Sequence, residues 1–308
     1  MNITNTHNLP LPVFRALAHE NYQKHGKNEI SVTSLIGPPK IRQLKLRHDE
    51  KISLDASERV WSLLGQSVHK VLELAAGEGD LSEGRLYQQD PKWNGWSLTG
   101  QHDLYQPAEA TLSDFKVTSV YSFLLGEKSE WEQQLNLNAM LLRHHGHAPH
   151  KLQIIAILRD WQSSKAELDP YGYPSCALHV VNIPLWTPEK CLSYATERIL
   201  LHQNAETLPD DDIPPCTPAE RWAKPDSFAL KKKGNKKATK VCQTLPEAQA
   251  LLATLGPLFT IETRPGGDTR CERYCPVAPF CSYYKNSKNS KNSKNSKNSK
   301  NNEPLPVP

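Results

Sequence analysis

The segment from Thr111 to Val117 carries an aspartate and a lysine two residues apart, Asp114 and Lys116. Successive side chains of a β-strand point to opposite faces, so in a strand this carboxylate and this ammonium would share one face. A second predicted strand, Ser97 to Tyr105, precedes it across Gln-Pro-Ala-Glu-Ala, whose proline favours a turn. If the two strands form an antiparallel hairpin, Asp103 lies about opposite Asp114, and both carboxylates can bind one hard cation. The spacing therefore predicts an Mg²⁺ site on this hairpin.

The chemistry that this arrangement suggests is phosphodiester hydrolysis. A cation held by Asp103, Asp114 and a backbone carbonyl would offset charge in the transition state and lower the pKa of bound water. Lys116 would then orient that water or stabilise the phosphoryl charge. An isolated Asp-x-Lys is more often a surface ion pair, so the interpretation depends on the motifs around it.

The elements that must position these residues follow the order helix, strand, strand, helix, strand. The periodicity and capping signals predict these elements in chain order: a helix over 55–76, strands over 97–105 and 111–117, a helix from Ser129 to about Gly146, a strand over 152–158, a strand over 177–185, and helices over 188–202 and 246–255. Arg159 and Asp160 end a predicted core strand, and Trp161 either covers the core or stacks on a base. This order predicts an α/β fold.

Several short motifs occur in order between Leu64 and Asp160. They are Gly65-Gln-Ser-Val-His69 with Glu73 one turn on, Gly100-Gln-His-Asp103, Asp114-Phe-Lys116, and Gln134 in the following helix. Together they resemble the PD-(D/E)XK nuclease superfamily, in its RecB-like and AddB-like branch, which includes phage exonucleases and CRISPR-associated relatives. The chain departs from that pattern at Asn138, where such nucleases often carry a tyrosine.

The resemblance implies a restriction-endonuclease-like core, with a central mixed sheet flanked by helices, and a role for each matched residue. It implies that His69, Asp103 and Asp114 ligate Mg²⁺ or Mn²⁺, that Lys116 handles the nucleophilic water, and that Gln134 steadies the lysine or contacts DNA. For His69, the alternative is a helix histidine satisfied by a neighbouring group. Glu73 fits a surface helix position as well as a place behind the metal ligands.

A second group of candidate ligands lies near the C-terminus. Cys271, Cys275 and Cys281 are bunched among prolines and aromatic residues, a pattern typical of a thiolate metal site. Cys216 is the best candidate for a fourth ligand and Cys242 the second. The other two cysteines, Cys176 and Cys191, are expected to pack as small apolar residues.

The identity of the metal at these cysteines stays open between a [4Fe-4S] cluster and Zn²⁺. In RecB-like relatives with an iron–sulfur cluster, three C-terminal cysteines with C-x2-C-x5-C spacing join one that precedes the nuclease core. Here the spacing is C-x3-C-x5-C, and Gly37-Pro38-Pro39 stands where the early cysteine is expected. Either metal would brace this region and not perform the cleavage.

The net charge of +4 comes mostly from the tail. Removing residues 285–308 takes away six lysines and one glutamate, which leaves 31 basic against 32 acidic residues, or about −1. What remains is local: Lys231, Lys232, Lys233, Lys236, Lys237 and Lys240 lie within ten residues. They form either a patch that binds DNA or a solvated surface turn.

We therefore expect a loosely ordered arm over 1–30, a nuclease core over 31–207, a cysteine-cluster region over 208–284 and a disordered Lys-Asn-Ser tail over 285–308. The chain lacks a sufficiently long apolar run for a membrane span or a signal peptide, so we expect a cytoplasmic protein that does not enter membranes.

The leading hypothesis is a DNA exonuclease or single-strand nuclease in recombination, repair or phage DNA processing, with a possible recombination or replication partner protein. A nucleic-acid-binding module that keeps the fold without catalysis, and a zinc-braced interaction protein, are the alternatives.

Overall fold

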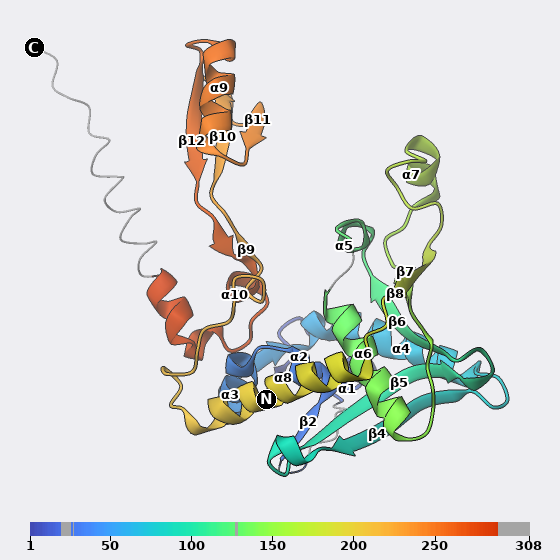
Figure 1. Cartoon of the computed structure of the whole chain (residues 1–308). Helices are drawn as coiled ribbons and strands as arrows, with labels where there is room; N and C mark the ends of the chain where they lie inside the picture. Colours follow the sequence, from blue (N-terminus) through green and yellow to red (C-terminus); the bar gives the residue numbers. More distant parts are fainter. Residues whose placement is uncertain (20–25, 27, 127–128, 289–308) are drawn as a thin grey trace, which may run out of the picture. The chain divides into compact units, whose positions relative to one another are not determined.

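The computed structural model describes residues 1–19, 26, 28–126 and 129–288 and divides the chain into two compact units (Figure 1). The first unit comprises Met1–Pro39 and Glu50–Thr207, and the second comprises Lys40–Asp49 together with the chain from Leu208 onward. The second unit thus also takes Lys40–Asp49 from within the region expected to form the nuclease core. Most of the predicted Lys-Asn-Ser tail, from residue 289, lies outside the described residues.

The first unit is a mixed α/β fold around a six-stranded sheet with order β2-β5-β6-β7-β8 and β4 paired to β5. Its strands are β2 (Glu29–Ser31), β4 (Leu81–Gln89), β5 (Ser97–Gln106), β6 (Thr111–Thr118), β7 (Lys151–Leu158) and β8 (Leu178–Ile183). β5 runs antiparallel to both β4 and β6, whereas β2 is parallel to β5, and β6 is parallel to β7. The predicted hairpin and the central mixed sheet are confirmed.

Helices cover both faces of this sheet (Figure 1). The helices of the first unit are α1 (Leu11–Ala18), α2 (Val32–Ile36), α4 (Val60–Leu74), α5 (Val120–Leu124), α6 (Ser129–His144), α7 (Ser163–Leu168) and α8 (Pro188–Thr207). On β6, Asp114 contacts Gln134 of α6, while the next residue, Phe115, meets the ring of His69 from α4 edge-on. Because neighbouring strand residues face opposite sides, α6 and α4 lie on opposite faces of the sheet.

Residues 1–30, expected to form a loosely ordered arm, include β1 (Asn2–Thr4) and α1 among the described residues. β1 pairs in parallel with β3 (Ser53–Asp55). Asp55 holds the two strands together, since its carboxylate accepts hydrogen bonds from the Thr4 and Thr6 side chains.

Helix α6 packs closely against strand β5 at Gly100. A methyl group at this position would lie 2.4 Å from Asn138 Oδ1 and 2.5 Å from Leu141 Cδ1. Gly100 therefore sets how near the helix lies to the sheet, and α6 carries Gln134 one turn before Asn138.

The second unit contains a three-stranded antiparallel sheet and several short elements. These are α3 (Pro39–His48), β9 (Ala223–Lys224), β10 (Ser227–Lys232), β11 (Lys240–Cys242), α9 (Leu245–Leu255), β12 (Phe259–Arg264), β13 (Gly267–Asp268) and α10 (Thr269–Arg273). The sheet order is β11-β10-β12, and Leu230, Cys242 and Ala248 form a small core between it and α9. None of the helices in the described ranges has the length and apolarity that crossing a membrane requires.

Candidate metal centre

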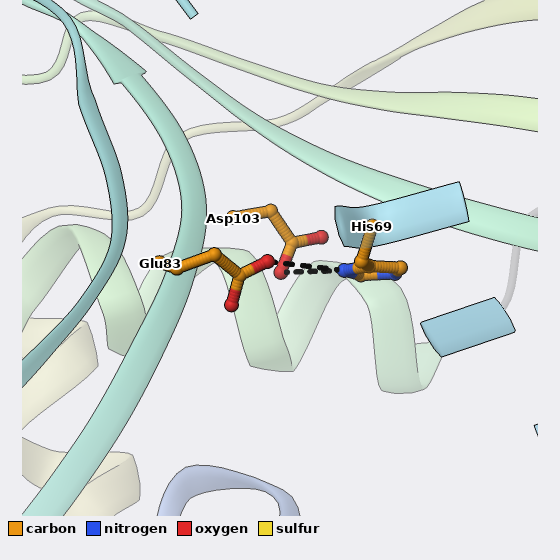
Figure 2. Close-up of side chains that lie close together, drawn as sticks. All are labelled: His69, Glu83 and Asp103. Carbon is orange, nitrogen blue, oxygen red and sulfur yellow. Dashed lines mark ion pairs between the residues drawn. The ribbon is translucent and has the colours of Figure 1, made fainter. Parts of the chain in front are cut away.

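Three side chains from three different elements meet beside the β5–β6 hairpin. His69 of α4 places Nδ1 3.4 Å from Glu83 Oε1 and 3.5 Å from Asp103 Oδ1 (Figure 2). The ligating atoms of His69, Glu83 and Asp103 all lie within 4.8 Å of one another. This group of one imidazole and two carboxylates could bind a metal ion.

Strand register explains why Asp103 lies at the centre of the site. The pairing of β5 with β6 ends at Leu104 and Ser113, so one step further Asp103 would stand opposite Asp114. There the strands part, and Asp103 Oδ2 accepts the backbone N–H of Phe115 at 2.7 Å. The side-chain oxygen Oδ2 of Asp103 thus accepts the amide hydrogen that a strand-pairing carbonyl would otherwise accept. The other oxygen, Oδ1, faces His69.

Glu83 occupies the corresponding position on the other side of β5. Ser82 pairs with Leu104 and Gly84 with His102, so Glu83 lies opposite Asp103 without being paired to it. Its φ is 52°, in the left-handed region that costs a non-glycine residue on the order of 1 kcal/mol or more. This strained backbone turns the Glu83 carboxylate toward His69 and Asp103.

A second cluster joins Asp114, Lys116 and Gln134 on the α6 side of the sheet. Lys116 Nζ lies 2.6 Å from Asp114 Oδ2 and donates to Gln134 Oε1 at 3.2 Å. Gln134 Nε2 donates to Asp114 Oδ1 at 2.8 Å. Gln134 therefore forms hydrogen bonds with both Asp114 and Lys116. The side chain of Lys116 is about a quarter exposed, so solvent reaches it.

The charges in the two clusters perturb one another. Hydrogen bonds to Asp103 and then Glu83 raise the pKa of His69 to about 10, against the effect of burial. Burial raises the pKa of Asp114 to about 6, with the Asp103 charge adding to the rise and Lys116 opposing it. Asp103 thus acts on both groups, and the imidazolium of His69 supplies the positive charge that the two carboxylates demand.

The carbonyl oxygen of Phe115 lies 3.0 Å from His69 Nε2, on the other side of the ring from Nδ1, so this contact orients the imidazole while Nδ1 faces the two carboxylates. Carboxylate and imidazole groups are ligands that Mn²⁺ and Mg²⁺ accept, and a cation must displace the proton on His69 Nδ1 to bind. The donor set therefore fits a divalent cation, with the Lys116 amine on the adjoining strand.

The structure places the residues that the sequence motifs assigned to the catalytic centre in two clusters, the first of which also contains Glu83. Asp114 contacts Lys116 and Gln134, and it is not in the group of three ligating side chains with His69 and Asp103. Glu73 lies apart in a surface ion pair with Lys70 at 2.9 Å. Trp161 packs against the core and donates to the carbonyl of Pro174.

The four cysteines singled out from the sequence line one pocket of the second unit. Cys216, Cys271, Cys275 and Cys281 share it with the cationic side chains of Lys40, Arg221 and Arg270. Burial raises the pKa of Cys216 to about 12 and that of Cys271 to about 11. The neighbouring thiols add to both shifts. The pocket gathers four half-buried thiols with cations around them, but among the described residues only the group of His69, Glu83 and Asp103 brings three ligating atoms within 4.8 Å of one another.

The remaining cysteines and the lysine cluster lie elsewhere. Cys242 and Cys191 are buried in apolar cores, whereas Cys176 is exposed, contrary to the expectation that it packs as a small apolar residue. The lysines surround the turn between β10 and β11, where Lys232, Lys233, Lys236, Lys237 and Lys240 are exposed. Lys231 is engaged with Glu262 of β12.

Comparison with known proteins finds similarity among solved structures. No protein-family model matches the chain, and no curated protein sequence matches it. The crystal structure of SSO0001 is similar at 16% identity and a TM-score of 0.45, over 61% of this chain and 84% of that one. A phage-related exonuclease from Haemophilus somnus 129PT is similar at 13% identity and a TM-score of 0.29, over 63% of this chain and 77% of that one. TM-scores this low carry no argument about activity, so the functional conclusion depends on the geometry of the site.

Proposed function

We propose that the chain is a metal-dependent nuclease that hydrolyses phosphodiester bonds in DNA, of the PD-(D/E)XK type. The observation that carries the proposal is the position of Asp103. It faces His69 and Glu83 with one oxygen, fixes the Phe115 amide with the other, and lies one register step from Asp114.

The chain's residues would divide the work between the two clusters. His69, Glu83, Asp103 and Asp114 would hold Mg²⁺ or Mn²⁺, with the Phe115 carbonyl orienting the His69 ring from its other side. When bound, such an ion offsets phosphate charge and lowers the pKa of its water. Lys116 orients the attacking water, and Gln134 fixes the lysine and Asp114 in that geometry.

Activity measurements on two variants test the proposal. Asp114→Asn and Lys116→Ala should each lower the initial rate of DNA cleavage about a hundredfold or more, as loss of a group acting in the transition state does. Lys70→Ala is the matched control, because it also removes a lysine from an ion pair, on the surface of α4, and should retain full activity. If the wild type with Mg²⁺ or Mn²⁺ cleaves neither single- nor double-stranded DNA, the proposal is wrong and a binding module is favoured.

We further propose that Cys216, Cys271, Cys275 and Cys281 hold a [4Fe-4S] cluster that braces the second unit. Anaerobically purified protein should contain about four iron atoms per chain and absorb visible light. Cys216→Ser should lose the iron, whereas Cys176→Ser, a control at an exposed thiol, should keep it. If the wild type contains zinc and no iron, the cluster proposal is wrong and the four cysteines bind Zn²⁺ instead.

The exposed lysines of the β10–β11 turn are proposed to contact DNA phosphates. Replacing Lys232, Lys233, Lys236 and Lys237 by glutamine should reduce the slope of log affinity against log salt by roughly 3 to 4 on duplex DNA, if all four bind phosphate. An unchanged slope would identify the turn as a solvated surface.

A further inference from the structure

Helix α4 carries apolar side chains on a face that the described residues of the first unit leave exposed. Val60, Leu64, Val71 and Leu74 are 44, 37, 65 and 76% exposed, and Ser67 is also exposed between them. No residue of this helix is fully buried. Burying such side chains is the main drive for folding and association, so a helix that leaves four of them in water is unusual.

The spacing of these five residues is that of a helix-pairing seam. They follow one another at intervals of four, three, four and three residues, the a and d positions of a heptad repeat. At about 100° per residue they fall within an arc of about 80°, and His69 projects from the opposite side of the helix. One face of α4 thus serves the metal centre and the other presents an unpartnered seam.

We propose that this seam is the contact between two copies of the chain, with α4 of one copy packed against α4 of the other around a two-fold axis. The seam is self-complementary, because the small Ser67 lies at its middle and each end carries one valine and one leucine. In either helix orientation, Ser67 comes to lie near Ser67 of the second copy.

The charge pattern permits two identical surfaces to meet. None of the five seam residues is charged, and Lys70 at the border is paired with Glu73 at 2.9 Å. Trp61, 60% exposed with the Arg159 guanidinium 4.4 Å from its ring centroid, extends the apolar border on the other flank. Like-charge repulsion therefore does not oppose the pairing.

The area agrees with a weak dimer. Together with Trp61, the apolar seam residues expose on the order of 500 Å², the size of patch that marks interaction sites. Two such patches bury roughly 1,000 Å², at the lower limit for a specific interface, so association in the micromolar range is expected.

Sedimentation equilibrium of the full chain tests the proposal. The wild type should pass from monomer to dimer across the micromolar range, and Val71→Glu should remain monomeric because it would place a charge in the seam of both copies. Gln66→Glu adds the same charge to an exposed position outside the seam and should dimerise as the wild type does. A monomeric wild type at the highest concentration, or a Val71→Glu dimer of wild-type affinity, overturns the proposal.

Cross-linking locates the contact and remains informative if Val71→Glu fails to fold. With a short thiol-specific cross-linker, Ser67→Cys should give covalent dimer well above the wild-type background from native thiols such as Cys176. Ser62→Cys, exposed on the same helix but outside the seam, should not exceed that background. Equal yields from the two variants would place the contact elsewhere.

Discussion

Gly100→Ala is expected to destabilise the first unit and to reduce activity in the protein that remains folded. The added methyl would lie 2.4 Å from Asn138 Oδ1, 2.5 Å from Leu141 Cδ1 and 3.0 Å from Val32 Cγ2. Ordinary contacts begin near 3.4 Å, so the buried side chains of Asn138 and Leu141, or helix α6 with them, must shift by up to about 1 Å. Such overpacking costs about 1 to 3 kcal/mol of unfolding free energy.

Alanine also lowers the conformational entropy of the unfolded chain, which offsets about 0.4 to 1 kcal/mol of the lost unfolding free energy. The net loss is then about 1 to 2 kcal/mol, or a urea midpoint lower by roughly 0.5 to 1 M for an m-value of about 2 kcal/mol/M. Tryptophan fluorescence suits the measurement, because six of the seven tryptophans lie in the first unit. Moving α6 also moves Gln134, and misplacement by about 1 Å can lower the rate about a hundredfold.

Two further variants separate packing from a general effect of alanine. Gly65→Ala, on α4, has open space around the added methyl and should stabilise the helix by about 0.5 to 1 kcal/mol. Combining Gly100→Ala with Asn138→Ala removes the nearest atom and should recover part of the lost stability, so the two effects are not additive. A Gly100→Ala protein as stable and active as the wild type would refute the reasoning about how α6 is positioned.

The other predictions concern charges and metal. Gln134→Leu should reduce the rate of cleavage about 10- to 100-fold in initial-rate assays, because both hydrogen bonds that hold Asp114 and Lys116 are lost. Metal affinity, measured by titration calorimetry, should rise about tenfold per pH unit from about pH 7 to 10, since the ion must displace the His69 proton held by a pKa near 10. His69→Gln should flatten this dependence, and a flat wild-type curve would contradict the assignment of His69 as a ligand. Mn²⁺ should raise the melting temperature of the wild type more than that of Asp103→Asn.

The parts of the site that lie on regular, alternating segments were predictable from the sequence. Asp114 and Lys116 lie two residues apart on a strand with a clear buried side, and the turn before it places Asp103 opposite by simple counting. The helix carrying Gln134 begins with a capping pattern and ends near a glycine, and its limits were predicted within two residues. Local sequence determines these features, so local reasoning finds them.

Glu83 was missed because nothing local predicts its conformation. Strand β4 reads Leu-Ser-Glu-Gly-Arg-Leu-Tyr-Gln-Gln, in which polar residues and Gly84 hide the alternation of a half-buried strand. The left-handed backbone of Glu83 arises from the pairing of β4 with β5, which is a tertiary constraint. The available signal was an acidic residue beside a glycine in the segment before β5, which is weak by itself.

Long-range packing also explains why Lys40–Asp49 belongs to the second unit. Lys40 is nearly fully buried there and donates through Nζ to the carbonyls of Asp210 and Ile213. The sequence of helix α3 gives no sign that Lys40 is buried, because a lysine ammonium is normally exposed. The two carbonyls precede Cys216 in the chain, so the residue that looks like surface in the sequence fixes the loop carrying a candidate ligand.

The strain and the charge at the metal centre have the same physical origin. Glu83 holds an unfavourable backbone to bring a second carboxylate against Asp103, and like charges this close raise the free energy of the folded protein unless a cation joins them. In the metal-free protein His69 provides that cation by keeping a proton well above its ordinary pKa. A site that needs one positive charge among fixed oxygen acceptors is already arranged for a divalent ion, and the ion would offset both the repulsion and the strain. Asp103 links this site to the Asp114 and Lys116 pair through the Phe115 amide, so its loss should disrupt both clusters, whereas loss of Glu83 should affect the metal ligands alone.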